Sequence, residues 1–442
     1  MLTVLTNITI KQTLSYQDST GKDIPRTLTL NFDFCHSYET SDSWSDLTNK
    51  GKIILPKNVY IRNSATGKLE SIGTYFGGPP SNINIGAAID SVPLLLRGDR
   101  VTISAGYRYL GQDGNYYDKQ PVIYQGFISR VTSKKPLEFE VEDNMWLLKQ
   151  IAVPVHTFTS SDTLESILNF MLSSPAGIKM MDAFGVTLTV NSLTETTFGA
   201  FRIGNENIAD FLSRLRKQFH FESYFRGDEL RCGSLVYLQS DIAGKNPPVF
   251  EFQNNIISDQ LEYSRKDDLK VSAIARNTID ENIPGGTTKD GSAKTKKTRL
   301  EVLVTINPGG TITSQPKVKG KDYPLNLDGV RSECTFLGAT TTDQLAILGA
   351  VHLKKYYYTG LKGKFTTFGL PFVRQGDNIQ LTDKILPERN GLYKVKRVDH
   401  TGGINGLRQV ITLDYRVGGA SLTLTPLELQ TCKAVGIDPS NI

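Results

Sequence analysis

The acidic residues come closest to a catalytic pattern in this chain. Four of them fall within one short segment: Glu138, Glu140, Glu142 and Asp143. Glycoside hydrolysis needs two carboxyl groups roughly 5–9.5 Å apart across a cleft. Three of these acids alternate with Phe139 and Val141, so we expect them on the outer face of one β-strand. Asp267 and Asp268 fall in a charged hairpin. A solvated surface is therefore the favoured interpretation of both groups.

Metal ligation and thiol chemistry are not indicated. The candidate ligands are His36, His156, His220, His352 and His400, together with Cys35, Cys232, Cys334 and Cys432. None of them shows HExxH, HxH or CxxC spacing, and the sequence contains neither a Walker loop nor a GxSxG elbow. We expect buried free thiols and predict no catalytic, cofactor-binding or metal-binding residue. Arg226-Gly227-Asp228 spells a cell-adhesion tripeptide, but it fits a hairpin turn between two strand-like segments.

Composition limits the class of protein. The chain has 442 residues, which predicts two to four domains. Hydrophobic residues make up 39% and charged residues 21%, as in a soluble globular protein. A net charge of +5 is too small to indicate a nucleic-acid-binding face. We see no run of about 18–20 apolar residues and no signal peptide, so we expect no membrane span and assembly in the cytoplasm of the producing cell.

Hydrophobic periodicity predicts an α+β fold that is predominantly β, with two related β-barrel domains around a small α+β domain. Residues 1–152 alternate as strands and form the first barrel. Residues 153–245 contain two helices, one with an Asp162/Glu165 capping pattern and one starting near Asn205. Residues 246–418 form the second barrel, with a mobile loop at 280–298 and a helix at 342–359 that Gly360 ends. Residues 419–442 form a tail whose Thr425–Glu428 capping box predicts a short helix.

An internal echo suggests that the two barrels are copies. Gly98-Asp99 and Gly376-Asp377 each precede an alternating strand, and glycine followed by aspartate suits a tight turn. The next strands also correspond, at 126–131 and 393–398, and so do the third strands, at 138–143 and 410–415. Chance similarity between short strands is the alternative. If the echo is real, three such chains in a ring present six equivalent barrels, which match a six-fold tube.

The same segments resemble a known family, the phage tail baseplate hub and late control protein D proteins, which are related to hubs of contractile injection systems. GDRVTISAGY, VIYQGFISRV and LEFEVEDNMWLLKQ resemble the first tube domain, and KGKFTTFGLPFVRQGDNIQLTD resembles the second. The positions that carry the pattern are Gly98, Asp99, Gly126, Gly363, Phe365, Gly369, Pro371, Gly376, Asp377, Tyr393 and Val395. The resemblance covers most of residues 85–417.

The resemblance implies a non-enzymatic structural protein of the virion tail. Such a hub is a homotrimer that joins the tail tube to a central spike, contacts tape-measure and baseplate proteins, and lets DNA pass without sequence-specific binding. No cofactor is implied. Two other functions stay open: a cell-wall-degrading or glycan-binding tail protein, and an outer baseplate adaptor without a channel. The Tyr356-Tyr357-Tyr358 run marks either a subunit interface or the packing of a helix end on its own barrel.

Overall fold

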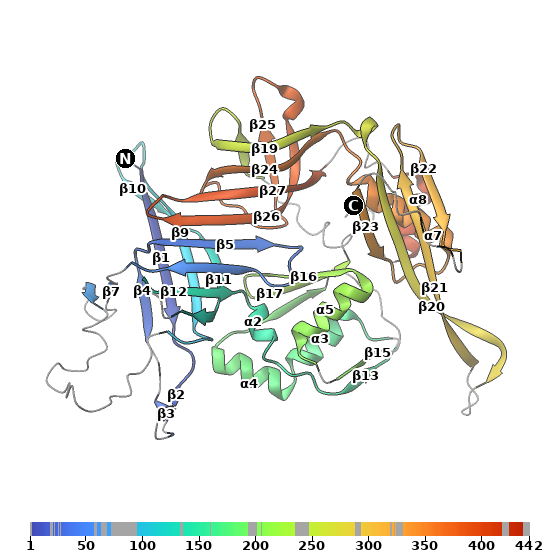
Figure 1. Cartoon of the computed structure of the whole chain (residues 1–442), viewed down its shortest axis with the longest axis horizontal. Helices are drawn as coiled ribbons and strands as arrows, with labels where there is room; N and C mark the ends of the chain where they lie inside the picture. The colour runs from blue at the N-terminus through green and yellow to red at the C-terminus, as the bar shows by residue number, and fades with distance from the viewer. Residues whose placement is uncertain are drawn as a thin grey trace.

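The computed structural model describes residues 2–17, 21, 23–24, 26, 28–56, 60–62, 69–71, 95–132, 136–159, 161–192, 201–204, 206–234, 247–287, 293–318, 321, 323, 330–417 and 424–435. β-Strands dominate and helices are few, which confirms the predicted fold class at this level (Figure 1). No helix in the described part of the chain is long and apolar enough to cross a membrane.

One 14-stranded sheet runs through both halves of the chain in the order β19-β24-β27-β26-β5-β6-β12-β11-β9-β1-β4, with β10 on β9, β25 on β26 and β18 on β25. Its strands are β1 Leu2–Lys11, β4 Thr29–Phe32, β5 Ser37–Ser43, β6 Lys50–Ile54, β9 Arg100–Leu110, β10 Tyr116–Lys119, β11 Val122–Val131, β12 Glu138–Glu142, β18 Val249–Glu251, β19 Ile256–Ser264, β24 Gly360–Phe368, β25 Asn378–Thr382, β26 Gly391–Gly403 and β27 Arg408–Val417. Among the described strands no pairing joins β19 to β4, so closure into barrels is not observed.

Two sets of five strands make up most of this sheet. We call β5, β6, β9, β11 and β12 unit A, and β19, β24, β25, β26 and β27 unit B. The apolar residues of each unit form a separate core. The core of unit A includes Tyr38, Val101 and Phe139, and the core of unit B includes Phe365, Ile379 and Tyr393. Alternation therefore buries one side of most of these strands, whereas most residues of β19 are exposed.

The region between the units is α+β. Its elements are α2 Met145–Leu148, β13 His156–Phe158, α3 Leu164–Leu172, α4 Pro175–Phe184, β14 Thr189–Ser192, β15 Phe201–Ile203, α5 Ile208–Phe219, β16 Phe221–Arg226 and β17 Glu229–Ser234. They surround a third core. The N-cap of α3 is Thr163 and not Asp162, whose carboxylate accepts from the Thr159 backbone N–H. Helix α4 was not predicted, and its Pro175 occupies the first turn after the Ser174 cap.

A fourth core lies within what the sequence analysis treated as one barrel. It is built from β20 Val271–Thr287, β21 Ala293–Ile306, β22 Ile312–Pro316 and β23 Val330–Thr335, together with α7 Thr342–Lys354 and α8 Pro426–Ala434. The stretch 280–298, interpreted as a mobile loop, consists mainly of strand because β20 and β21 extend into it. Helix α7 ends at Lys354, short of residue 359, and Gly360 begins β24 instead of capping the helix.

Helix α8 has the predicted Thr425/Glu428 capping box. It does not stand apart as a tail, because Cys432 is buried in the fourth core and Lys354 pairs with Glu428 at 2.7 Å. The remaining strands are short: β2 Tyr16–Gln17, β3 Asp23–Ile24, β7 Tyr60–Arg62 and β8 Leu69–Ser71. Two 3-10 turns occur, η2 Lys266–Asp268 and η3 Pro387–Arg389.

Candidate functional site

The two Gly-Asp turns have the same geometry. Gly98 has φ +98° and Gly376 has φ +79°, which glycine adopts without strain. Gly98 donates to the carbonyl of Ile128 at 2.8 Å, and Ile128 donates back to Asp99 at 2.9 Å. Gly376 and Val395 make the same exchange with Asp377, with both N···O distances at 2.8 Å. Ile128 of β11 therefore corresponds to Val395 of β26.

The aspartate side chains cap the two turns in the same way. Asp99 Oδ2 accepts from the Leu96 backbone N–H at 2.8 Å. Asp377 Oδ2 accepts from the Arg374 backbone N–H, also at 2.8 Å and also three residues upstream. The predicted turn-capping role of both carboxylates is thus observed.

The correspondence extends along the strands. The β11–β12 ladder shifts between Ile128 and Arg130, and the β26–β27 ladder shifts between Val395 and Arg397. Both units therefore carry a bulge at the same place, followed by an arginine and then a valine. Bulges re-aim a strand and occur at specific positions, so a shared bulge favours duplication over chance similarity.

A further echo was missed by the sequence analysis. Glu140 pairs with Lys52 in unit A, and Thr412 pairs with Lys364 in unit B. Glu140 corresponds to Thr412, because each is the partner of the arginine after the bulge. Lys50-Gly51-Lys52 of β6 therefore corresponds to Lys362-Gly363-Lys364 of β24. By the same reasoning β5 corresponds to β19, because Lys52 pairs with Glu39 and Lys364 pairs with Gln260. The repeated Lys-Gly-Lys tripeptide is the feature of the sequence that could have revealed this correspondence.

The two units share a hydrogen-bonded seam. β26 of unit B pairs antiparallel with β5 of unit A, from Arg397 opposite Ser43 to Gly403 opposite Ser37. The connection also involves loops. Tyr107 Oη donates to the Leu407 carbonyl at 3.1 Å and accepts from the Gly369 N–H at 3.2 Å. The duplicated units therefore form one continuous sheet.

Charged side chains cross this seam in a regular row on the sheet face that turns away from the cores. Successive register partners give the row Arg408, Thr401, Glu39, Lys52, Glu140 and Arg130. Their signs alternate apart from the threonine. The same face holds a cavity of about 450 Å³ lined by residues of β5, β6, β12 and β26. Cross-strand pairs of opposite charge stabilise a sheet and leave little net charge on its surface.

The Arg226-Gly227-Asp228 turn fastens the inserted region to both Gly-Asp turns. Arg226 pairs with Asp377 at 2.6 Å, and Asp228 pairs with Arg100, which follows Asp99, at 3.0 Å. Gly227 has φ +64° at the tip of the β16–β17 hairpin. The predicted hairpin turn is confirmed, and its two charged residues serve internal contacts.

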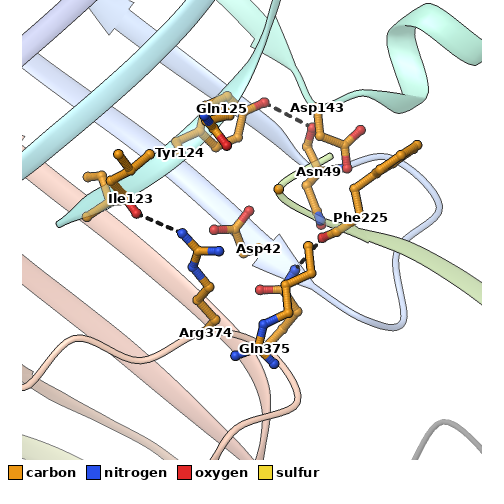
Figure 2. Close-up of a pocket in the computed structure, with 12 residues that line it drawn as sticks. Asp42, Asn49, Ile123, Tyr124, Gln125, Asp143, Phe225, Arg374 and Gln375 are labelled. Atoms are coloured by element: carbon orange, nitrogen blue, oxygen red, sulfur yellow. Dashed lines mark hydrogen bonds between the residues drawn. The ribbon is translucent and has the colours of Figure 1, made fainter. Parts of the chain in front are cut away.

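A small cavity lies where unit A, unit B and this hairpin meet (Figure 2). Its volume is about 30 Å³, room for one or two waters and far too small for a sugar ring. Burial raises the pKa of Asp42 to about 7, with a further increase from Asp143. Burial likewise raises the pKa of Asp143 to about 7. Asp143 is therefore buried and Asp42 half-buried at this junction, and the cavity cannot hold a glycan between them.

The remaining positions of the predicted signature have structural roles. Gly126 allows close approach of β12, because a Cβ there would lie 2.1 Å from the Glu142 carbonyl. Gly363 has φ +117° and approaches Gln260 in the same manner. Phe365 lies edge-on to Phe250, and the Tyr393 hydroxyl accepts from the Leu361 N–H at 3.0 Å. Gly369 lies against Leu407, and Pro371 follows a cis peptide bond.

The tyrosine run packs inside the chain. Tyr357 is 7% exposed and belongs to the fourth core, and Tyr358 is 4% exposed and belongs to the core of unit B. Tyr356 is half-buried between these two cores and meets Tyr415 edge-on. Of the two alternatives left open, this arrangement favours packing of the helix end.

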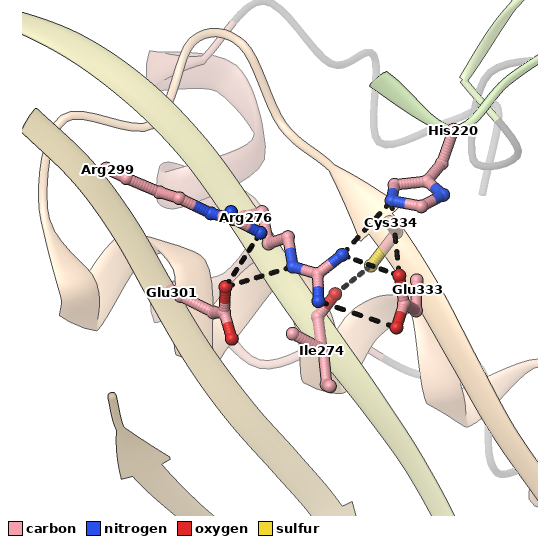
Figure 3. A network of polar contacts seen from close by, with 7 residues as sticks. All are labelled: His220, Ile274, Arg276, Arg299, Glu301, Glu333 and Cys334. Carbon is pink, nitrogen blue, oxygen red and sulfur yellow. Dashed lines mark hydrogen bonds and ion pairs between the residues drawn. The ribbon is translucent and has the colours of Figure 1, made fainter. Parts of the chain in front are cut away.

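A second polar network joins the inserted region to the β20–β23 sheet (Figure 3). Arg276 bonds to Glu301 at 3.1 Å and to Glu333 at 2.5 Å. His220, the C-cap of α5, lies 3.4 Å from Glu333, and burial lowers its pKa. The charges compensate one another, which indicates a structural contact. Among the described residues no group of His, Cys, Asp and Glu could hold a metal ion, and all four cysteines are buried as free thiols.

No family model and no curated protein matches the sequence. Solved structures do match. A 43 kDa tail protein of prophage MuSo2 from Shewanella oneidensis is 12% identical, with a TM-score of 0.45 over 92% of this chain and 98% of that one. A tail protein from Neisseria meningitidis MC58 is 10% identical, with a TM-score of 0.47 over 95% and 98% of the two chains. An E. coli component of the type VI secretion system is 10% identical, with a TM-score of 0.42 over 89% and 76%. The structural neighbours are thus phage tail proteins and a component of a type VI secretion system.

Proposed function

We propose that this chain is a structural hub subunit of a phage tail baseplate or a related injection apparatus. Three copies form a ring of six similar units, which joins a six-fold tail tube to a central spike and lines the channel between them. The observation that carries the proposal is the duplicated unit, with its Gly-Asp turn, its bulge and its Lys-Gly-Lys strand on one continuous sheet.

The duplication supports the proposal through symmetry. A three-fold object cannot contact a six-fold tube equivalently at all six positions unless each of its chains contributes two similar surfaces. Units A and B provide two such surfaces, and the seam between β26 and β5 fixes their relative position. Tube, tape-measure and baseplate proteins are the further partners, and the location is the virion tail.

The charged row supports a role in lining the channel. DNA is bound nonspecifically when basic side chains replace its counterions. Here Lys52 pairs with Glu138 at 3.0 Å and Arg130 lies 3.7 Å from Glu140, so acids accompany the basic groups of this face. A wall of this kind lets DNA slide past without retaining it.

Native mass spectrometry of the purified chain, alone and with the tube and spike proteins of the same tail, tests the proposal. We expect a trimer, at the latest when the partners are present. A monomer in the presence of both partners would overturn the hub assignment.

Electron microscopy and an activity assay separate the other two functions. A complex without a central hole would indicate an outer adaptor. Clearing of a peptidoglycan or polysaccharide gel by the chain, lost on substitution of one carboxyl group, would indicate a hydrolase. We expect a central hole and no clearing.

A further inference from the structure

The seam between β26 and β5 has an open counterpart in unit A, at the outer edge of β11. In unit B, the ladder between β26 and β25 ends where Lys394 pairs with Asn378, and β5 takes over that side of β26 from Arg397 onward. In unit A, the ladder between β11 and β9 ends at the corresponding place, where Phe127 pairs with Arg100. Beyond it, Arg130 and Val131 of β11 have no strand partner on that side among the described residues.

The strand that would fill this place also exists, at the far end of the same chain. β5 corresponds to β19, and β19 is the terminal strand of the described sheet, paired only with β24. Most of its residues are exposed, including Tyr263 at 45%. An open sheet edge is a ready site for pairing with another chain.

We propose that β19 of one chain pairs antiparallel with the outer edge of β11 of the next chain, and that three such contacts close the ring. This inference rests on the proposed hub function and specifies its subunit interface. The contact joins two different surfaces head to tail, so it forms a closed ring when the rotation between chains is one third of a turn.

The internal seam also fixes the register. Arg397 pairs with Ser43, Val398 with Asp42 and Asp399 with Ser41. The corresponding residues of unit A are Arg130, Val131 and Thr132, and those of unit B are Ser264, Tyr263 and Glu262. The interface therefore pairs Arg130 with Ser264, Val131 with Tyr263 and Thr132 with Glu262, each on a neighbouring chain.

The side chains suit this register. Arg130 and Val131 match Arg397 and Val398 in type, and Ser264 matches Ser43. Three positions differ in type: Thr132 and Glu262 stand where Asp399 pairs with Ser41, and Tyr263 stands where unit B meets Asp42. Tyrosine buries a large area while keeping a polar tip, and it is enriched at interfaces. Pairing with Val131 would cover the exposed ring of Tyr263.

Disulfide trapping tests the register. We would make two double variants, Val131→Cys with Tyr263→Cys and Thr132→Cys with Glu262→Cys. Directly opposed residues in an antiparallel pair have Cα atoms roughly 4.5 or 5.5 Å apart, within the range of a disulfide. The four native cysteines are buried and give little background. After mild oxidation we expect a non-reducing gel to show dimers and a covalent trimer as the largest product.

Two controls sharpen the test. Val131→Cys with Asp259→Cys moves one thiol four residues along β19, roughly 13 Å, so little cross-linking is expected. A mixture of the single variants Val131→Cys and Tyr263→Cys should give dimers and no covalent trimer, because each chain then carries only one introduced thiol.

The outcomes separate this inference from the hub assignment. A native trimer that cross-links no better in the matched pairs than in the control overturns the proposed interface and leaves the hub function in place. A monomer in the presence of tube and spike overturns both. Cross-linked products longer than three chains overturn the closed ring.

Hydrogen exchange on the unsubstituted chain covers the case in which the variants fail to fold. Successive N–H groups of a strand point to opposite sides, and in the internal seam Trp44, two residues from Asp42, donates to Lys396 on the β26 side. Tyr263 corresponds to Asp42, so we expect its backbone amide to exchange at least tenfold more slowly in the trimer than in the dissociated chain. Equal exchange in the two states would overturn the interface.

Discussion

Units A and B contain the same turn but neutralise its aspartate from different sources. In unit A, Asp99 makes a two-pronged ion pair with Arg26 at 2.8 and 2.7 Å, and both side chains are at most 1% exposed. In unit B, Asp377 pairs with Arg226 of the inserted hairpin, and these side chains are 24% and 20% exposed. The turn thus requires a compensating cation, but the cation need not belong to the unit. Arg26 lies between β3 and β4, outside the strands of unit A, and the pair between Arg226 and Asp377 also fastens the inserted region.

The largest effect should come from removing Arg26, and Arg226 provides the comparison. Arg26→Leu leaves a buried carboxylate without its guanidinium, so we expect a loss of about 3–5 kcal/mol in the free energy of unfolding. Arg226→Leu removes a partly exposed pair, so we expect a loss of about 1 kcal/mol. Urea unfolding of both variants measures the difference. Equal losses in the free energy of unfolding would contradict the expectation that the buried Arg26–Asp99 pair stabilises the fold more than the partly exposed Arg226–Asp377 pair.

The matching glycines provide a second contrast. Gly363 has φ +117°, and a Cβ there would lie 2.2 Å from the Gln260 carbonyl on β19. Gly51 lacks a positive φ, and its Cβ would meet Glu39 O at 3.0 Å. We expect Gly363→Ala to destabilise the fold by about 2–3 kcal/mol, and Gly51→Ala by about 1 kcal/mol.

The position of Gly363 beside β19 adds a readout of assembly. Gly363→Ala pushes β19, the proposed interface strand, away from β24. In this variant the trimer should therefore dissociate at a lower urea concentration than the one at which the chain unfolds. Size-exclusion chromatography in increasing urea measures this separation. Gly51→Ala is the matched control, since β5 and β6 lie inside the chain. Loss of the trimer in both variants alike would contradict the assignment of β19 to the interface.

These correspondences explain what the sequence could and could not predict. The Gly-Asp turns were found because each is local and lies just before its strand. The Lys-Gly-Lys echo was missed because β5 and β6 are neighbours in sequence, whereas β19 and β24 are separated by β20–β23 and α7. The fourth core was missed because the polar residues of 280–298 resemble a loop, although their strands are held by a long hairpin ladder. Helix α4 was missed because Pro175 and Gly177 look like helix breakers.

The acids at the junction predict a pH effect that belongs mainly to unit A. Asp42 and Asp143, raised to a pKa of about 7, correspond to Tyr263 and Tyr415 in unit B. An unfolded aspartate has a pKa of about 3.9, so between about pH 4 and pH 7 the folded chain binds more protons. This contribution to stability is complete below about pH 4 and is lost as pH rises through 7.

We therefore expect the chain to unfold at a higher urea concentration at pH 5 than at pH 8. The free energy of unfolding should fall by on the order of 1 kcal/mol per pH unit between these values. Asp42→Asn with Asp143→Asn should flatten the profile. It should not abolish the slope, because burial also raises the pKa of Glu222 to about 7 and that of Asp414 to about 6. An unchanged slope in the double variant would place the pH dependence elsewhere.

The smallest effect should come from the other arm of the hairpin. Asp228 is 39% exposed and pairs with Arg100 at 3.0 Å, and it also accepts from the Asn144 side-chain amide at 2.9 Å. Exposed pairs contribute little, so Asp228→Ala should lower the free energy of unfolding by less than about 1 kcal/mol, no more than Arg226→Leu. Position explains the difference: Arg226 neutralises the turn aspartate itself, whereas Asp228 contacts Asn144 and Arg100, the residue that follows the first turn. A double-mutant cycle between Asp228→Ala and Arg100→Ala measures the pair directly. A coupling larger than that between Arg226 and Asp377 would mean that the inserted region is fastened mainly to unit A.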